Sequence, residues 1–166
     1  MNEKKIIIGF IILTFSILAG GVYILSTTFS SPQINTSQNA KAGVLEKTYN
    51  WGEIAYSGSD AIKTFTIKNT GTDILKLTNI KTSCACTYAQ LTIEGKVSPK
   101  FGMHTTSSWV GEVPPDKEAQ LMVVFDQDFH GPTGVGPVER LISVETNDIQ
   151  NPNLEFSLKG VVVKDK

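Results

Sequence analysis

The two cysteines of the chain, Cys84 and Cys86, lie in the segment KTSCACTYAQ with a single alanine between them. Side chains two residues apart on a strand project to the same face, so both thiolates can reach one metal ion. On a straight strand their Cα atoms lie about 6–7 Å apart, so a disulfide requires a bent backbone and closes a very small loop. The spacing therefore favours a soft-metal site over a labile disulfide, a thiol relay or simple core packing.

Both histidines of the chain lie in segments without a strand pattern. His104 follows Met103 in GKVSPKFGMHTTSSWVG, residues 95–111, and His130 lies in DQDFHGPTGVGP, residues 126–137. Long loops without their own secondary structure are uncommon in compact domains and often carry function. Imidazole and thioether groups are suitable ligands for soft and borderline metals, so these loops supply the remaining candidate ligands.

Together these residues predict one soft-metal site. The expected ligands are Cys84, Cys86 and His104, with His130 or Met103 completing the shell. Cu(I) is favoured because thiolate, thioether and imidazole all suit it and low coordination numbers are acceptable. Zn(II) is the alternative if both histidines join both cysteines in a tetrahedral set. The site requires both loops to approach the cysteines, and otherwise no cofactor is expected.

An uncharged apolar run over residues 6–25 follows Lys4 and Lys5. About 20 apolar residues in a helix are enough to span a bilayer. The two lysines predict that residues 1–5 stay in the cytoplasm and that the rest of the chain is exported. A cleavable signal peptide is the alternative, but its apolar region is normally about 7–15 residues long. We therefore expect an uncleaved, single-pass signal anchor in the membrane.

Residues 26–43 are rich in serine, threonine, asparagine and glutamine and hold almost no large apolar side chains. Such a segment cannot bury enough surface to offset the entropy of ordering it, so we expect a flexible tether. Residues 44–166 then form one domain of common size.

Apolar and polar residues alternate with a period of two through this domain, and turn residues separate the runs. Phe65 and Ile67 share one face of their segment, and Leu154, Phe156 and Leu158 share one face of another. This alternation is typical of half-buried antiparallel strands. The fold class that we expect is all-β: an immunoglobulin-like antiparallel β-sandwich of about seven strands, preceded by one transmembrane helix.

Five segments in the same order carry a resemblance to a known family. They are Tyr49–Ile54, Phe65–Gly71, Thr82–Thr87 with its S-C-x-C-T motif, Thr146–Asp148, and Leu158–Val162. The sequence resembles the bacterial domain-of-unknown-function 1573 family, an exported immunoglobulin-like domain related in shape to the ASH and major-sperm-protein domains. The resemblance implies the fold rather than the function, because the biochemistry of the family is largely undefined. Ala85 stands where the family usually has glycine, and the two histidine loops resemble insertions.

Motif content and charge exclude several classes of function. The sequence has no nucleophile-elbow serine and no glycine-rich phosphate loop, so we expect no enzyme activity. A formal net charge of −1 argues against binding to nucleic acid. Two functions of different classes remain. One is a membrane-anchored, exported soft-metal module, and the alternative is a structural or adhesive module that contacts a cell-envelope protein; a thiol oxidoreductase is a weaker third.

Overall fold

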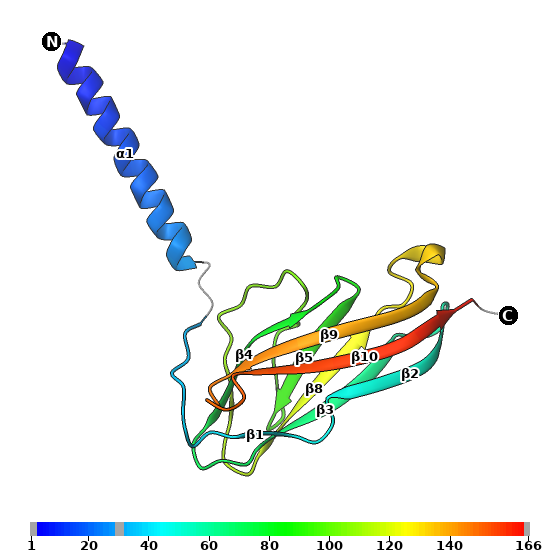
Figure 1. Ribbon diagram of the computed structural model, residues 1–166. Coiled ribbons are helices and arrows are strands. Elements are labelled where there is room, and N and C mark those ends of the chain that lie inside the picture. Colours follow the sequence, from blue (N-terminus) through cyan, green and yellow to red (C-terminus); the bar gives the residue numbers. More distant parts are fainter. Residues whose placement is uncertain (1–2, 29–31, 165–166) are drawn as a thin grey trace. The chain divides into compact units, whose positions relative to one another are not determined.

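The computed structural model describes residues 3–28 and 32–164, and the chain divides into two compact units at residues 31 and 32 (Figure 1). The first unit is helix α1 (Glu3–Thr28). Its stretch from Glu3 to Ile24 is long and apolar enough to cross a membrane, although a signal sequence near the N-terminus has the same properties. The expected anchor is therefore a helix, and residues 1 and 2 of the expected cytoplasmic end lie outside the described residues.

The second unit is a β-sandwich whose described residues form two five-stranded sheets. The first sheet has the order β1 (Ala42–Val44), β3 (Ala61–Asn69), β8 (Glu118–Phe125), β5 (Thr87–Ile93), β6 (Lys96–Val97). The second sheet has the order β2 (Thr48–Ala55), β10 (Asn153–Val163), β9 (Gly136–Thr146), β4 (Leu75–Thr82), β7 (Gly111–Val113).

The expectation of an immunoglobulin-like sandwich is confirmed, with two differences in detail. The described residues form ten strands instead of about seven, because the three short strands β1, β6 and β7 add to the edges of the sheets. The pairing of β2 with β10 is parallel, whereas the other strand pairs are antiparallel. Short pieces of two or three residues carry too little alternation to be recognised in a sequence.

The core lies between the sheets, as the alternation predicts. Phe65 on β3 and Phe156 on β10 are buried, and their ring centroids lie 4.9 Å apart. Leu121 on β8 pairs with Phe65 across the first sheet and is also buried. Large apolar side chains from both sheets thus remove their surface from water together, which is the main stabilising contribution to the fold.

The segment expected to be a flexible tether, residues 26–43, begins in helix α1, which ends at Thr28, and belongs to the compact unit from Pro32 onward. Residues 29–31 lie outside the described residues, but Ser37 forms a bridge to Asp148 and Ala40 is fully buried in the core. β1 then begins at Ala42, so the compact unit starts before residue 44. Backbone pairing does not depend on large apolar side chains, so a polar segment can add to the domain despite its composition.

Candidate redox and metal site

The two cysteines lie in a tight turn between β4 and β5, not on a straight strand. The hydroxyl of Thr82, at the end of β4, donates to the carbonyl oxygens of Cys84 and Thr87 at 3.0 Å each. The N–H of Thr87 donates to the Cys84 carbonyl at 3.2 Å and closes the turn. Ala85 is not among the residues with positive φ, so the turn forms without the glycine that is usual in the related family.

This turn supplies the bend that a disulfide requires. The Cα atoms of Cys84 and Cys86 lie 5.2 Å apart and the two sulfurs are bonded. Two free thiolates are expected from the sequence only if the cysteines lie on an extended backbone. That expectation is corrected here: the Thr82 hydrogen bonds shorten the distance between the Cα atoms into the ordinary disulfide range.

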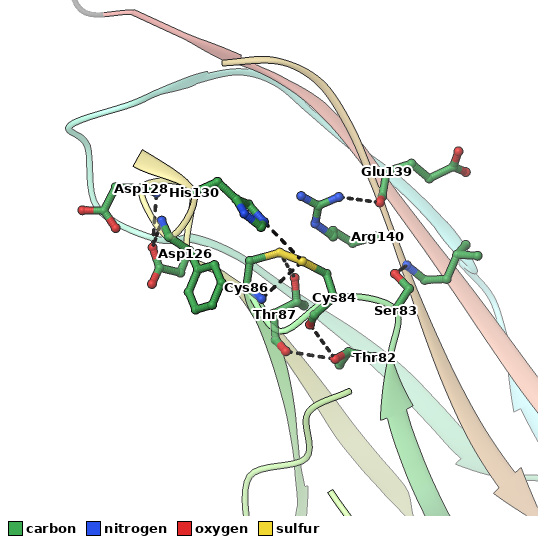
Figure 2. The surroundings of a disulfide bond; sticks show 12 residues. Thr82, Ser83, Cys84, Cys86, Thr87, Asp126, Asp128, His130, Glu139 and Arg140 are labelled. Carbon is green, nitrogen blue, oxygen red and sulfur yellow. Dashed lines mark hydrogen bonds between the residues drawn. A yellow bond between two sulfur atoms is a disulfide. The ribbon is translucent and has the colours of Figure 1, made fainter. Parts of the chain in front are cut away.

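His130 is the loop ligand that the tertiary structure brings to the cysteines (Figure 2). Its Nε2 lies 3.6 Å from Sγ of Cys84, and one ligand atom from each of Cys84, Cys86 and His130 lies within 4.8 Å of the others. Cys84 is half-buried, Cys86 is only 2% exposed, and His130 is exposed. The arrangement therefore has a solvent side, formed by Cys84 and His130, and a buried side, formed by Cys86.

The loop that carries His130 is held against the turn through Asp126. The N–H of Asp126 donates to the carbonyl of Cys86 at 2.9 Å, and its Oδ1 accepts the N–H groups of Asp128 and Phe129. Hydrogen bonding with Asp126 and the charge of that carboxylate raise the pKa of Asp128 above its ordinary value. These contacts fix the start of the loop and hence the position of the imidazole relative to the disulfide.

His104 is not part of this cluster, and Met103 and His104 lie in a different loop from His130. Their loop is held along β5, because Phe101 is buried and exchanges two backbone hydrogen bonds of 2.8 Å with Ala89. Beyond Phe101 the side chains of Met103 and His104 are exposed. The structure thus brings together three of the five expected ligands, Cys84, Cys86 and His130, and leaves His104 outside the cluster.

Arg140 is a charged neighbour of the turn and lies in no recognisable motif of the sequence. Ser83 pairs with Leu141 on β9 through two hydrogen bonds of 2.9 Å, and this antiparallel register places Arg140 opposite Cys84. The guanidinium lies over the ring of Phe125, 4.7 Å from its centroid, and Nη1 donates to the Glu139 carbonyl. Figure 2 shows the Arg140 side chain and the His130 ring extending toward the disulfide from different segments.

Burial lowers the pKa of Arg140, which nevertheless remains a permanent cation at neutral pH. Its Nε is buried and has no hydrogen-bond partner among the described residues. It is the single arginine of the chain, and that was its only signal in the sequence. A half-buried cation beside two sulfurs favours negative charge on them after reduction.

The fold and the turn together define an immunoglobulin-like β-sandwich with a disulfide of two cysteines separated by one residue. The resemblance to the domain-of-unknown-function 1573 family is confirmed: the model of that family, described as "Protein of unknown function (DUF1573)", matches residues 43–100. This match includes the turn with both cysteines but ends before His104 and His130. Comparison with curated proteins gave no match.

Solved structures support the fold. A protein of unknown function from Porphyromonas gingivalis W83 is 18% identical with a TM-score of 0.57, and the match covers 77% of this chain and 49% of that one. The ASH/PapD-like domain 7 of human CEP192 is 17% identical with a TM-score of 0.50, and the match covers 82% of this chain and 95% of that domain. This chain therefore spans about half the length of the first structure, and at these identities the likeness concerns the fold alone.

Proposed function

We propose that this chain is a membrane-tethered, extracytoplasmic domain that reversibly binds a soft metal ion when its disulfide is reduced. The observation that carries the proposal is the convergence of Cys84, Cys86 and His130, whose ligand atoms lie within 4.8 Å of one another. In the oxidised state the sulfurs are bonded to each other and do not offer two thiolates. Two electrons from a dithiol reductant convert the disulfide into two thiols, which lose their protons as the metal binds.

The ligand set favours Cu(I) over Zn(II). Two thiolates and one imidazole make three ligands, which Cu(I) accepts, whereas structural Zn(II) sites almost always have four. Among the histidine, cysteine and carboxylate groups of the described residues, no fourth ligand joins these three. Two thiolates and Cu(I) carry a net charge of −1. The N–H of Cys86, 3.3 Å from Sγ of Cys84, and the Arg140 cation are placed to stabilise that charge.

In this proposal the domain binds the metal ion without catalysing a reaction, and it acts outside the cytoplasm. Helix α1 anchors it as a single-pass span, and Lys4 and Lys5 hold the N-terminus inside. A metal site on a tethered domain handles or senses the ion close to the membrane surface, where cell-envelope proteins are its partners. A reporter that is active only outside the cytoplasm, fused after Lys166, is expected to work.

The experiment measures Cu(I) binding to the full chain in detergent, reduced and kept without oxygen, by competition with a chromophoric Cu(I) chelator. We expect His130→Ala to weaken binding about 10- to 100-fold, by analogy with the loss of other groups that support metal sites. Cys84→Ser and Cys86→Ser should abolish the high-affinity site. His104→Ala is the matched control and should bind like the parent, because His104 lies outside the cluster. Equal binding by His130→Ala and the parent would contradict the proposal.

A structural or adhesive module that contacts a cell-envelope protein is the second candidate, and the disulfide itself favours it. Large apolar side chains are exposed on the first sheet and next to it, including Ile62 on β3 and Leu45 after β1. In that case the disulfide is a passive cross-link. Absence of metal binding by the fully reduced parent would favour this candidate over the first.

A further inference from the structure

We infer that the Cys84–Cys86 disulfide is opened by a protein dithiol that attacks Sγ of Cys84, with Cys86 as the leaving sulfur. The inference deepens the proposed function, on which it rests for its purpose, by naming the step and the class of partner that open the metal site. The exchange itself involves no metal, so the two can be tested separately.

The difference in burial between the two sulfurs determines which of them is attacked. Cys86 packs in a small apolar cluster with Ile54, Phe125 and Val162, and only 2% of the residue is exposed. Cys84 lies at the edge of that cluster and is half-buried. Thiol–disulfide exchange depends on access of the attacking thiolate to the sulfur. A thiolate from a partner therefore meets Cys84 first.

Each of the two sulfurs has neighbouring groups that can stabilise it when it leaves as a thiolate. When the new bond to Cys84 forms, the old bond breaks and Cys86 leaves as a thiolate. The Thr87 hydroxyl lies 3.6 Å from Sγ of Cys86 and can donate to that buried charge. In the second step Cys84 is the leaving thiolate. The Cys86 N–H lies 3.3 Å and Nε2 of His130 lies 3.6 Å from its sulfur, and the Arg140 side chain extends toward the disulfide (Figure 2).

The chemistry of resolution indicates a dithiol partner. After the first step the Cys86 thiolate lies next to the mixed disulfide, where its effective concentration is high. If the partner is a monothiol, the Cys86 thiolate attacks Cys84, expels the monothiol and restores the original disulfide. A second thiolate on the partner competes by attacking the partner's own sulfur, which breaks its bond to Cys84. The partner ends with one new disulfide, and two electrons have moved from it to Cys84 and Cys86. Monothiols therefore reduce this site inefficiently.

The test uses the full chain in detergent with a metal chelator present throughout. The oxidised parent is mixed with glutathione, quenched with iodoacetamide and mapped by peptide mass spectrometry. We expect glutathione on Cys84 and the alkyl group on Cys86 in about tenfold excess over the reverse pattern. In addition, reduced Cys86→Ser should react with oxidised glutathione about tenfold faster than reduced Cys84→Ser. Equal rates, or a preference for Cys86, would overturn the inference.

A second test asks whether the charge of Arg140 acts on the approaching thiolate. Its measured quantity would not change if Arg140 had a purely structural role. The rate of opening by an anionic thiol, 2-mercaptoethanesulfonate, is divided by the rate with a cationic thiol, cysteamine. Arg140→Gln should lower this ratio about threefold or more, because a half-buried cation acts strongly on charge beside it. The exposed Lys68→Gln on β3 is the control and should leave the ratio unchanged. An unchanged ratio in Arg140→Gln would contradict an influence of Arg140 on the approaching thiolate.

The outcomes distinguish this inference from the proposed function. Chemically reduced protein that binds Cu(I) but shows no preference for Cys84 would leave the metal site intact and overturn only the exchange order. Protein that exchanges at Cys84 but does not bind Cu(I) would retain the exchange order and overturn only the metal site.

Discussion

At the residue scale, the site is an oxidised pair whose closed loop is very short. A disulfide stabilises mainly by removing chain entropy from the unfolded state, and this effect grows with the length of the loop. Cys84 and Cys86 are only two positions apart, so little entropy is removed. The fold instead depends on the core between the sheets. A disulfide that contributes little to stability can open and close without unfolding the domain, as the proposed function requires.

Reduction of the disulfide is expected to lower the free energy of unfolding by no more than about 2 kcal/mol, because the closed loop is so short. Urea unfolding of the full chain in detergent, followed by tryptophan fluorescence with and without a dithiol reductant, measures the difference. Cys84→Ala combined with Cys86→Ala should give the same value. Loss of cooperative unfolding on reduction would show that the cross-link is structural and would contradict a reversible site.

At the element scale, Asp148 joins the segment before β1 to the β9–β10 turn. It is buried, and its carboxylate accepts the N–H groups of Ala42 and Gln150 and the side-chain amide of Asn151. Lys41 lies 3.8 Å from its Oδ1. Burial alone raises the pKa of Asp148, but these hydrogen bonds and the Lys41 charge outweigh it, so the pKa lies below its ordinary value.

Asp148→Asn should therefore destabilise the domain by about 1–3 kcal/mol near neutral pH, because an amide cannot accept all of these hydrogen bonds. A lowered pKa in the folded state means that the ionised carboxylate stabilises above the unfolded value of about 3.9. That contribution is lost as the pH falls through the folded pKa. The parent should thus approach the variant in stability as the solution becomes strongly acidic. Urea unfolding over a pH series checks this.

The control for this prediction is Glu118→Gln, which changes an exposed carboxylate on β8. It should leave the free energy of unfolding within about 0.5 kcal/mol of the parent at every pH. A constant difference between Asp148→Asn and the parent down to strongly acidic pH would contradict the lowered pKa.

At the scale of the whole molecule, the boundary of the folded unit lies at residue 32. Asn39 and Lys41 accept backbone hydrogen bonds from Thr72 and Thr70 in the β3–β4 turn. Gly71 in the same turn lies so close to this segment that a Cβ there would overlap the Asn39 carbonyl. The segment before residue 44 is thus part of the sandwich, and helix α1 with residues 29–31 precedes it.

A variant that lacks residues 1–31 should unfold cooperatively with nearly the stability of the full chain. A variant that lacks residues 1–43 should lose about 2 kcal/mol or more, because it removes the buried Ala40 and leaves the Asp148 carboxylate with fewer donors. Urea unfolding of both variants, followed by tryptophan fluorescence, measures the difference. Equal stability would place the boundary at residue 44, as the composition of the sequence predicts.

Local patterns in the sequence predict the class of fold and the apolar N-terminal helix. Both depend on local periodicity: alternation places Phe65 and Phe156 inward, and an uncharged run of about 20 residues predicts a spanning helix. Cys84 and Cys86 were also recognisable, because their types and spacing are rare. The parallel pairing of β2 with β10 was not, since register between distant strands leaves no local pattern.

Which histidine loop lies at the disulfide depends on contacts that form only in the folded domain. His104 and His130 lie in loops of similar composition, and the local pattern favours His104 because it follows Met103. The backbone pairing of Phe101 with Ala89 holds one loop along β5, whereas the hydrogen bond from Asp126 to Cys86 brings the other to the disulfide. Arg140 reaches the same turn through the register of β9 with β4. These are contacts between residues far apart in the chain, and such contacts form only when the sheets pair.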